Sequence, residues 1–262
     1  YHPGQEELPG LTAARDYLEA WNSRNEDAWA AALHFPHSRP SAGYHRVHQT
    51  AAELTSGFDL DTVVATGWDH TRFAELDVVH HGNDKAHIAA EWVRYDKDGR
   101  EMLRNQDSYI ATREDGRWAL RARFGVGTPL PEGREREENA TAALDVVKKY
   151  MATFNQRDPQ AWAATLNYPH LRIASGDLVV HDTETEFAEQ MDFGAFAKRF
   201  GWDHSEWDHI EAIQVAENGV TVALRFSRYD SSDQVLSTFE TLYLVTRENG
   251  RWGIRARSSF AP

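Results

Sequence analysis

The feature that most constrains how this chain can fold is an internal repeat. The stretch YLEAWNSRNEDAWAAAL, which begins at Tyr17, returns as YMATFNQRDPQAWAATL at Tyr150, 133 positions later. The stretch YIATREDGRW, which begins at Tyr109, returns as YLVTRENGRW at Tyr243, 134 positions later. Similarity of this length does not arise by chance, so each copy is expected to fold around its own core.

The repeat sets the expected domain boundaries. We predict a first domain over residues 1–124 and a second over residues 139–262, each of a common domain size. The residues between them, 125–138, contain Gly, Pro and charged side chains and are typical of a linker.

Within each copy, the spacing of the apolar residues changes from helical to alternating. In the first copy it is helical over residues 14–21, a second short helix is expected around Trp29, and the spacing is helical again from Thr50 to Thr66, opened by the capping-box sequence TAAE. Alternation then predicts four strands, at residues 73–81, 85–95, 106–113 and 118–124. The second copy repeats this order, and helices followed by a strand meander indicate an α+β fold.

Composition excludes several classes of function. The chain has 41 acidic and 28 basic residues and a formal charge of −13, so we expect no nucleic-acid partner and no binding to an anionic membrane. It contains no cysteine, which excludes thiolate chemistry, and no Gly-rich phosphate loop or dinucleotide fingerprint, so no cofactor is expected. No apolar run is long enough for a membrane span. These features do not identify the cellular compartment, and we favour the cytoplasm.

The order of elements, with each copy ending in Asp/Asn-Gly-Arg-Trp, resembles the nuclear transport factor 2-like superfamily over nearly all of both copies. The segments FPHSR (35–39), YPHLR (168–172) and the two GWDH segments (67–70 and 201–204) are similar to those of uncharacterised bacterial members. The resemblance implies two tandem cystatin-like α+β cone domains. Each would have three helices against a curved, mostly antiparallel sheet, with a pocket at its open end.

The superfamily includes ketosteroid isomerase, scytalone dehydratase and polyketide cyclases, together with members that catalyse no reaction. Because single-copy relatives commonly form homodimers, we expect the two copies to pair as an intramolecular pseudo-dimer, and further homo-oligomerisation stays open. The motif around the catalytic Tyr and Asp of ketosteroid isomerase is not visible in this chain.

Several polar residues recur between the copies and are the candidate catalytic residues. They are His37, Arg39, His48, Asp69 and His70 in the first copy and His170, Arg172, His181, Asp203 and His204 in the second. Imidazole can transfer protons near neutral pH, and a guanidinium can stabilise an oxyanion. We expect His37 and His170 to transfer protons and Arg39 and Arg172 to anchor an oxyanion or carboxylate, with the Asp-His pairs as secondary candidates.

A structural interpretation stands beside the catalytic one, because a duplication keeps in both copies what each domain needs to fold. For Trp-Asp-His we favour a structural turn, with His packed on Trp. The alternating pairs Arg121/Arg123 and Arg255/Arg257 favour a solvated or ion-paired strand face. A metal site formed by three histidines of the first copy, His37, His48 and His70, is the weakest alternative.

Aromatic side chains at matching positions are candidates for substrate binding. They are Tyr17, Trp92 and Tyr109, with the polar Asp107, in the first copy and Tyr150, Phe226 and Tyr243 in the second. Asp107 is either a base that the second copy has lost or part of an exposed edge. Because the two copies differ at this strand, their pockets are expected to differ in polarity.

Together these features predict a small-molecule pocket protein whose ligand or substrate is aromatic or alicyclic. We expect a cofactor-independent acid–base lyase, dehydratase or isomerase. The alternative is a non-catalytic ligand-binding or scaffold protein with the same fold, and a metal-dependent hydrolase is a more distant third.

Overall fold

Two units with the same order of elements make up the chain. The computed structural model describes residues 8–174 and 176–261. Apart from Ser41–Gly43, which group with the second unit, the chain divides between Gly127 and Thr128. Below, the two parts are called the N-terminal unit and the C-terminal unit. Residues 1–7 of the first predicted domain and residues 175 and 262 of the second lie outside the described residues.

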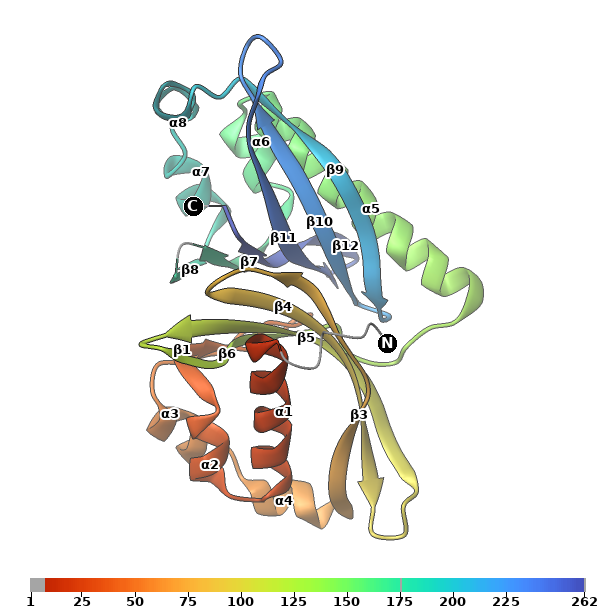
Figure 1. Ribbon diagram of the computed structural model, residues 1–262. Helices are drawn as coiled ribbons and strands as arrows, with labels where there is room; N and C mark the ends of the chain where they lie inside the picture. Colours follow the sequence, from red (N-terminus) through yellow and green to blue (C-terminus); the bar gives the residue numbers. More distant parts are fainter. Residues whose placement is uncertain (1–7, 175, 262) are drawn as a thin grey trace. The chain divides into compact units, whose positions relative to one another are not determined.

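Each unit consists of helices followed by a long strand meander (Figure 1). The elements of the N-terminal unit are α1 (Pro9–Asn22), α2 (Glu26–Ala31), β1 (Leu33–Ser38), β2 (Val47–His48), α3 (Ala51–Ser56), α4 (Leu60–Ala65), β3 (Trp68–His81), β4 (Lys85–Asp96), β5 (Glu101–Glu114) and β6 (Arg117–Gly125). Those of the C-terminal unit are α5 (Gly133–Asn155), α6 (Pro159–Ala163), β7 (Leu166–Ala174), β8 (Asp177–His181), α7 (Glu184–Glu189), α8 (Phe193–Phe200), β9 (His204–Val215), β10 (Gly219–Tyr229), β11 (Val235–Glu248) and β12 (Arg251–Ser259).

The two sheets have the same topology. Each has six strands, in the order β2-β1-β6-β5-β4-β3 and β8-β7-β12-β11-β10-β9. All neighbouring strands are antiparallel except β1 with β6 and β7 with β12, which are parallel. The α+β class and the mostly antiparallel sheet predicted from the sequence are therefore confirmed. No helix of the described residues is long and apolar enough to cross a membrane.

The long first helix of each unit packs on its sheet through matching aromatic side chains. Tyr17 of α1 and Tyr109 of β5 have ring centroids 5.6 Å apart, and Tyr150 of α5 and Tyr243 of β11 repeat this contact, also at 5.6 Å. The pairing of β5 with β6 and of β11 with β12 shifts register at equivalent positions. Such bulges bend a sheet, and here they curve it around the helix.

The capping boxes predicted at two helix starts are present. Thr50 accepts a hydrogen bond from the backbone N–H of Glu53 at 3.2 Å, and the Glu53 carboxylate accepts one from the N–H of Gln49 at 2.7 Å. Thr183 and Glu186 repeat both contacts. These hydrogen bonds satisfy backbone donors that a helix start leaves free.

The expected single helix from Thr50 to Thr66 is instead two short helices, α3 and α4. The chain leaves the helix after Ser56, and Asp59 accepts hydrogen bonds from the N–H groups of Asp61 and Thr62, which starts a new helix. Because Asp192 caps α8 in the same way, each unit has four helices in the described residues rather than three.

The expected linker, 125–138, is shorter in the structure. α5 already begins at Gly133, and Arg134 forms an ion pair with Glu138 at 2.6 Å along the helix surface. Charged side chains spaced by four residues support an exposed helix. This first turn carries no apolar stripe, which is why the sequence pattern indicated a linker.

A hydrogen-bonded lock joins the end of the first helix to the first long strand in each unit. The Asn155 side chain donates to the carbonyl of Ser205 at 2.8 Å and accepts from its N–H at 3.0 Å, while Trp202 donates to the Ser205 hydroxyl at 2.9 Å. Asn22 and Trp68 make the same contacts with Thr71. The Trp-Asp-His segments belong to this lock.

Replacing Asn155 by Ala is expected to destabilise the C-terminal unit. The substitution removes two hydrogen bonds and leaves part-buried backbone groups without a partner, which costs about 2–3 kcal/mol of unfolding free energy. Urea denaturation measures this loss. The adjacent, exposed Gln156→Ala is the matched control, and an equal effect of the two substitutions would contradict the lock.

Candidate functional site

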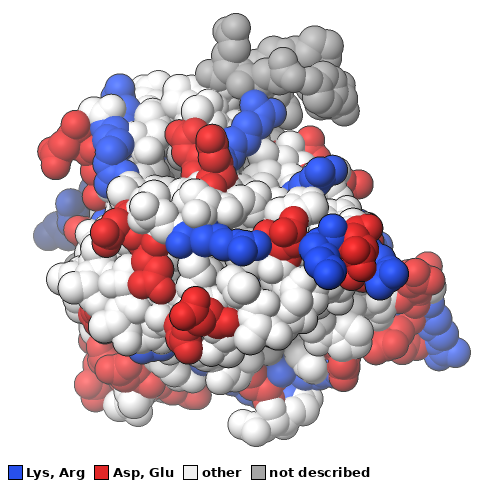
Figure 2. Space-filling model, turned by 90° about the horizontal axis from the view of Figure 1, so that it is seen from below, with Lys and Arg blue, Asp and Glu red and all other residues white. Residues whose placement is uncertain are grey.

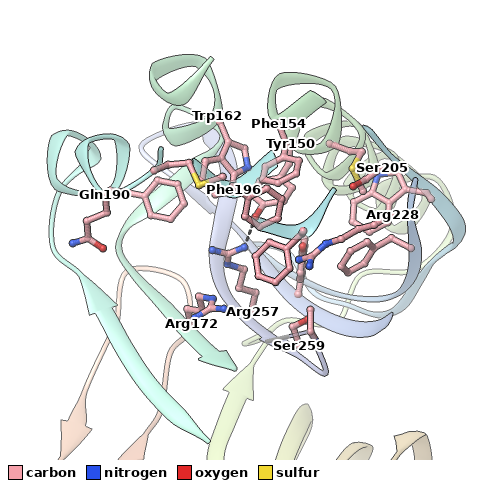
Figure 3. Close-up of a pocket in the computed structure, with 18 of the residues that line it drawn as sticks. Tyr150, Phe154, Trp162, Arg172, Gln190, Phe196, Ser205, Arg228, Arg257 and Ser259 are labelled. Atoms are coloured by element: carbon pink, nitrogen blue, oxygen red, sulfur yellow. Dashed lines mark hydrogen bonds between the residues drawn. The ribbon is translucent and has the colours of Figure 1, made fainter. Parts of the chain in front are cut away.

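The C-terminal unit encloses a cavity of about 520 Å³, called here the C-terminal cavity (Figure 3). Its walls come from α5, α6, α7, α8 and the sheet. The residues that line it are Tyr150, Met151, Phe154, Trp162, Arg172, His181, Phe187, Gln190, Met191, Phe196, Arg199, Phe200, Ser205, Trp207, Phe226, Arg228, Tyr243, Arg257, Ser259 and Ala261. Cavities that bind small molecules have volumes of this order.

Aromatic rings form most of one side of the C-terminal cavity. Phe154 packs against Trp162 with ring centroids 5.2 Å apart, and against Phe196 at 5.7 Å. Trp207 meets Phe226 edge-on at 5.9 Å. Rings held at such distances form a rigid apolar surface that suits a flat or alicyclic molecule.

Guanidinium groups reach into the same cavity from the sheet. Figure 3 shows Arg228 and Arg257 extending toward one region from different sides, with Arg172 beside them. Arg257 donates a hydrogen bond to the Tyr150 hydroxyl, drawn as the dashed line in Figure 3. Burial, opposed by Arg257, raises the pKa of Tyr243 far above its usual value, so this phenol stays protonated at neutral pH.

The N-terminal unit has a smaller cavity with the same arginine positions. The N-terminal cavity has a volume of about 150 Å³ and is lined by Tyr17, Leu18, Trp21, Arg39, Phe58, Thr71, Trp92, Arg94, Asn105, Tyr109 and Arg123. Its Arg39, Arg94 and Arg123 correspond to Arg172, Arg228 and Arg257. The two cavities therefore share a set of three guanidinium groups and differ in size.

Asp107 lies among these groups in the N-terminal unit. Its side chain is 1% exposed, accepts a hydrogen bond from Trp92 Nε1 at 2.5 Å, and its Oδ2 lies 3.6 Å from Nε of Arg123. Asp107 is therefore buried and does not lie on an exposed strand edge, which was one of the two alternatives considered from the sequence.

The structure places His37 and His170 away from both cavities, which corrects the expectation that they project into a pocket. Each is fully buried, and its Nδ1 donates to a strand carbonyl, that of Leu120 at 3.1 Å and that of Ile254 at 2.9 Å. These contacts lie where the parallel strand pairs shift register. Burial, then a nearby arginine, lowers the pKa of each imidazole well below 6.5.

The second recurring histidine pair is divided between the two units. His181 lines the C-terminal cavity, and its Nδ1 is buried with no hydrogen-bond partner among residues 8–174 and 176–261. Burial and the charge of Arg257 lower the pKa of His181, so the imidazole is neutral at neutral pH. His48 is also buried but is not one of the residues lining the N-terminal cavity.

The Asp-His pairs lie on the surface and line neither of these two cavities, so the structure does not bring these secondary candidates to the candidate site. His70 bonds its neighbour Asp69 at 2.9 Å and stacks on Tyr95 at 5.2 Å. His204 does the same with Asp203 and Tyr229. They stay outside because both follow the Trp of the helix–sheet lock, where the long strand begins. These contacts agree with the structural interpretation, except that the ring beneath each His is a Tyr rather than the Trp.

Two of the arginine positions were missed or misassigned from the sequence. Arg123 and Arg257 were expected on a solvated or ion-paired face. Arg123 is indeed paired with Asp107, but both arginines line cavities, which was not expected. The register shift beside Arg121 breaks the strand alternation, so Arg121 bonds the Phe35 carbonyl and Glu114 instead. Arg94 and its counterpart were not singled out, although their recurrence was visible in the sequence.

No group of three or more His, Asp or Glu side chains suited to a metal ion is found in the described part of the chain. The three-His site considered from the sequence is not formed, because His70 lies on the surface while His37 and His48 pair across β1 and β2.

The surface differs in charge from the C-terminal cavity. On the face shown in Figure 2, Lys and Arg side chains stand beside Asp and Glu rather than forming one basic patch. Among the described residues that line the C-terminal cavity there are four arginines and no Asp or Glu. A chain of net charge −13 thus holds an interior of the opposite sign.

Comparisons with known proteins agree with this fold. A family model described as NTF2-like protein (DUF6841) matches residues 12–126 and again residues 137–260. No curated protein matches the chain.

Similar solved structures each cover about one copy of the repeat. A Nostoc punctiforme protein of unknown function with a cystatin-like fold is 13% identical, with a TM-score of 0.40, over 47% of this chain and 90% of its own. A ketosteroid isomerase-like protein from Erwinia carotovora atroseptica is 18% identical, with a TM-score of 0.36, over 48% and 98%. An NTF2-like protein from Novosphingobium aromaticivorans is 10% identical, with a TM-score of 0.40, over 48% and 82%.

The buried imidazoles predict a loss of stability in mild acid. Because the folded-state pKa of His170 lies below 6.5, the unfolded chain binds a proton first as the pH falls through this value. The unfolding free energy should therefore be constant above pH 6.5 and fall below it. His170→Asn, which keeps an N–H donor, should reduce the fall from pH 6.5 to 5.5 by about 1 kcal/mol. Urea denaturation at both pH values tests this, and an unchanged fall would contradict it.

Proposed function

Because the chain belongs to the family of NTF2-like proteins (DUF6841) along both of its halves, we propose that it is a small-molecule pocket protein whose C-terminal unit binds an aromatic or alicyclic ligand. The family supplies the fold, and the site must supply the function. The observation that carries the proposal is the C-terminal cavity of about 520 Å³.

The two cavities differ in their capacity for a ligand. Most of the residues that line the C-terminal cavity are aromatic or methionine, and a few are polar. Such a lining is typical of small-molecule sites. The N-terminal cavity, at about 150 Å³, has room for little more than solvent or a very small molecule. We therefore assign ligand binding to the C-terminal unit.

Proton transfer on the ligand is a second candidate function, favoured by the state of His181. This imidazole lines the cavity, and its lowered pKa leaves it neutral, so it can accept a proton. Its Nδ1 has no partner among the described residues. His181 takes the role that the sequence assigned to His170, and the reaction would be a cofactor-independent lyase, dehydratase or isomerase step.

Filling the C-terminal cavity is expected to weaken binding of an aromatic molecule. Met191 lines this cavity, and Phe58 occupies the equivalent place in the N-terminal cavity. Met191→Trp should weaken the binding of 2-naphthamide, measured by calorimetry, by at least about tenfold, since it removes the volume that the ring would fill. Phe58→Trp is the matched control and should leave binding unchanged. Equal binding by the wild type and Met191→Trp, or no binding at all, would contradict the proposal.

The acid–base function predicts hydrogen exchange at a carbon acid. If His181 removes a proton next to a carbonyl, the protein should catalyse exchange of the acidic hydrogens of 2-tetralone in D2O, observed by NMR. His181→Gln should reduce this rate by about 100-fold or more, while His48→Gln in the N-terminal unit should not change it. Exchange that survives in His181→Gln would assign the proton transfer to another group.

A further inference from the structure

We propose that the ligand of the C-terminal unit carries a carboxylate held by Arg228 and Arg257, and that Asp107 supplies the equivalent carboxylate from within the N-terminal unit. This inference rests on the proposed function and adds the chemical class of the ligand. It follows from a comparison of the two units at one position.

Asp107 and Thr241 occupy the same place in the two sheets. Asp107 of β5 pairs with Ala90 of β4 and Gly125 of β6. Thr241 of β11 pairs with the residues 134 positions after these two. The register is therefore identical, and the two side chains start from equivalent points of the backbone.

In the N-terminal unit, a buried carboxylate lies among the guanidinium groups and pairs with one of them. Asp107 lies 3.6 Å from Arg123 and is fixed by the hydrogen bond from Trp92. Burial alone would lower the pKa of Arg123, but the charge of Asp107 holds that pKa above its usual value. Asp107 also opposes the effect of burial on Arg39 and Arg94. The unit thus contains its own anion.

In the C-terminal unit, the same position holds no anion. The Thr241 hydroxyl donates to the carbonyl of Ser258 at 2.9 Å, and Phe226 replaces the tryptophan that holds Asp107. Within residues 8–174 and 176–261, neither Arg228 nor Arg257 has an acidic oxygen within ion-pair distance. Arg228 lies over the rings of Phe239 and Phe196 at 5.0 and 5.1 Å, as its counterpart Arg94 lies over those of Trp92 and Trp21 at 5.4 and 5.6 Å. The difference between the units is therefore the missing acidic partner of Arg257.

The chemistry of this difference identifies the ligand class. Charged groups inside a protein are usually paired, and a guanidinium matches a carboxylate with two parallel hydrogen bonds. Since one carboxylate pairs with Arg123 in the N-terminal unit, a ligand with a single carboxylate would take the same place beside Arg257. The aromatic rings beside the arginines would receive the rest of the molecule. We therefore expect an aromatic or alicyclic monocarboxylic acid.

Calorimetry with two probes of equal size tests the inference. The wild type should bind 2-naphthoate at least about tenfold more tightly than the neutral 2-naphthamide, as a charge-assisted hydrogen bond requires. Arg257→Met should remove this preference while still binding the amide. Thr241→Asp should lose naphthoate binding because it supplies the anion internally, and Thr241→Asn, of equal size and no charge, should keep it.

The outcomes separate this inference from the proposed function. Equal affinity for the two probes in the wild type, or an unchanged preference in Arg257→Met, would overturn the proposal that the ligand carries a carboxylate held by the arginines. The assignment of ligand binding to the C-terminal cavity would remain. Binding of neither probe would overturn both.

The N-terminal unit offers a reciprocal test that needs no aromatic ligand. Asp107→Ala should lower the melting temperature, because it leaves buried guanidinium groups without their anion. Acetate should then raise the melting temperature of Asp107→Ala more than that of the wild type, compared with chloride at equal ionic strength. An identical response of the two proteins to acetate would show that Asp107 does not occupy an anion site.

Discussion

The interior of each unit depends on how three guanidinium groups are kept inside a curved sheet. Burying a cation is costly unless an anion or an aromatic face compensates for the lost water. In the N-terminal unit Asp107 provides this compensation for Arg123, and Trp21 and Trp92 provide an aromatic face for Arg94. In the C-terminal unit, aromatic faces surround Arg228 and the Tyr150 hydroxyl meets Arg257. The unit with its own anion has the smaller cavity, of about 150 Å³, and the unit without one has the larger, of about 520 Å³.

The duplication explains how both solutions occur in one protein. The helix–sheet lock, the capping boxes and the strand register are the same in the two units, so the fold is maintained in each. Side chains that do not take part in these contacts were able to diverge, and Thr241 and Phe226 are two of them. The expected pairing of the two copies as a pseudo-dimer stays a prediction.

Much of the fold could be predicted from the sequence, because the repeat, the capping boxes and the alternating strands are local patterns. The site could be predicted only in part. His37 and His70 were chosen because they recur in both copies. In the structure His37 donates a hydrogen bond to a backbone carbonyl, and His70 stacks on a tyrosine at the surface. The position of Arg123 in a cavity, apart from Arg121, could not be predicted because a strand bulge, which reverses the side-chain alternation, leaves no mark in the sequence. The position of Asp107 depends on tertiary contacts with Trp92, which no spacing reveals.

The central claim, that the C-terminal unit binds an aromatic carboxylate through its arginines, is tested most directly by a crystal structure of the protein with 2-naphthoate. The account predicts the ring against Trp162 and Phe226, and the carboxylate oxygens about 3 Å from the guanidinium nitrogens of Arg257. A ligand bound outside this cavity, or bound in it with the carboxylate directed away from the arginines, would contradict the account.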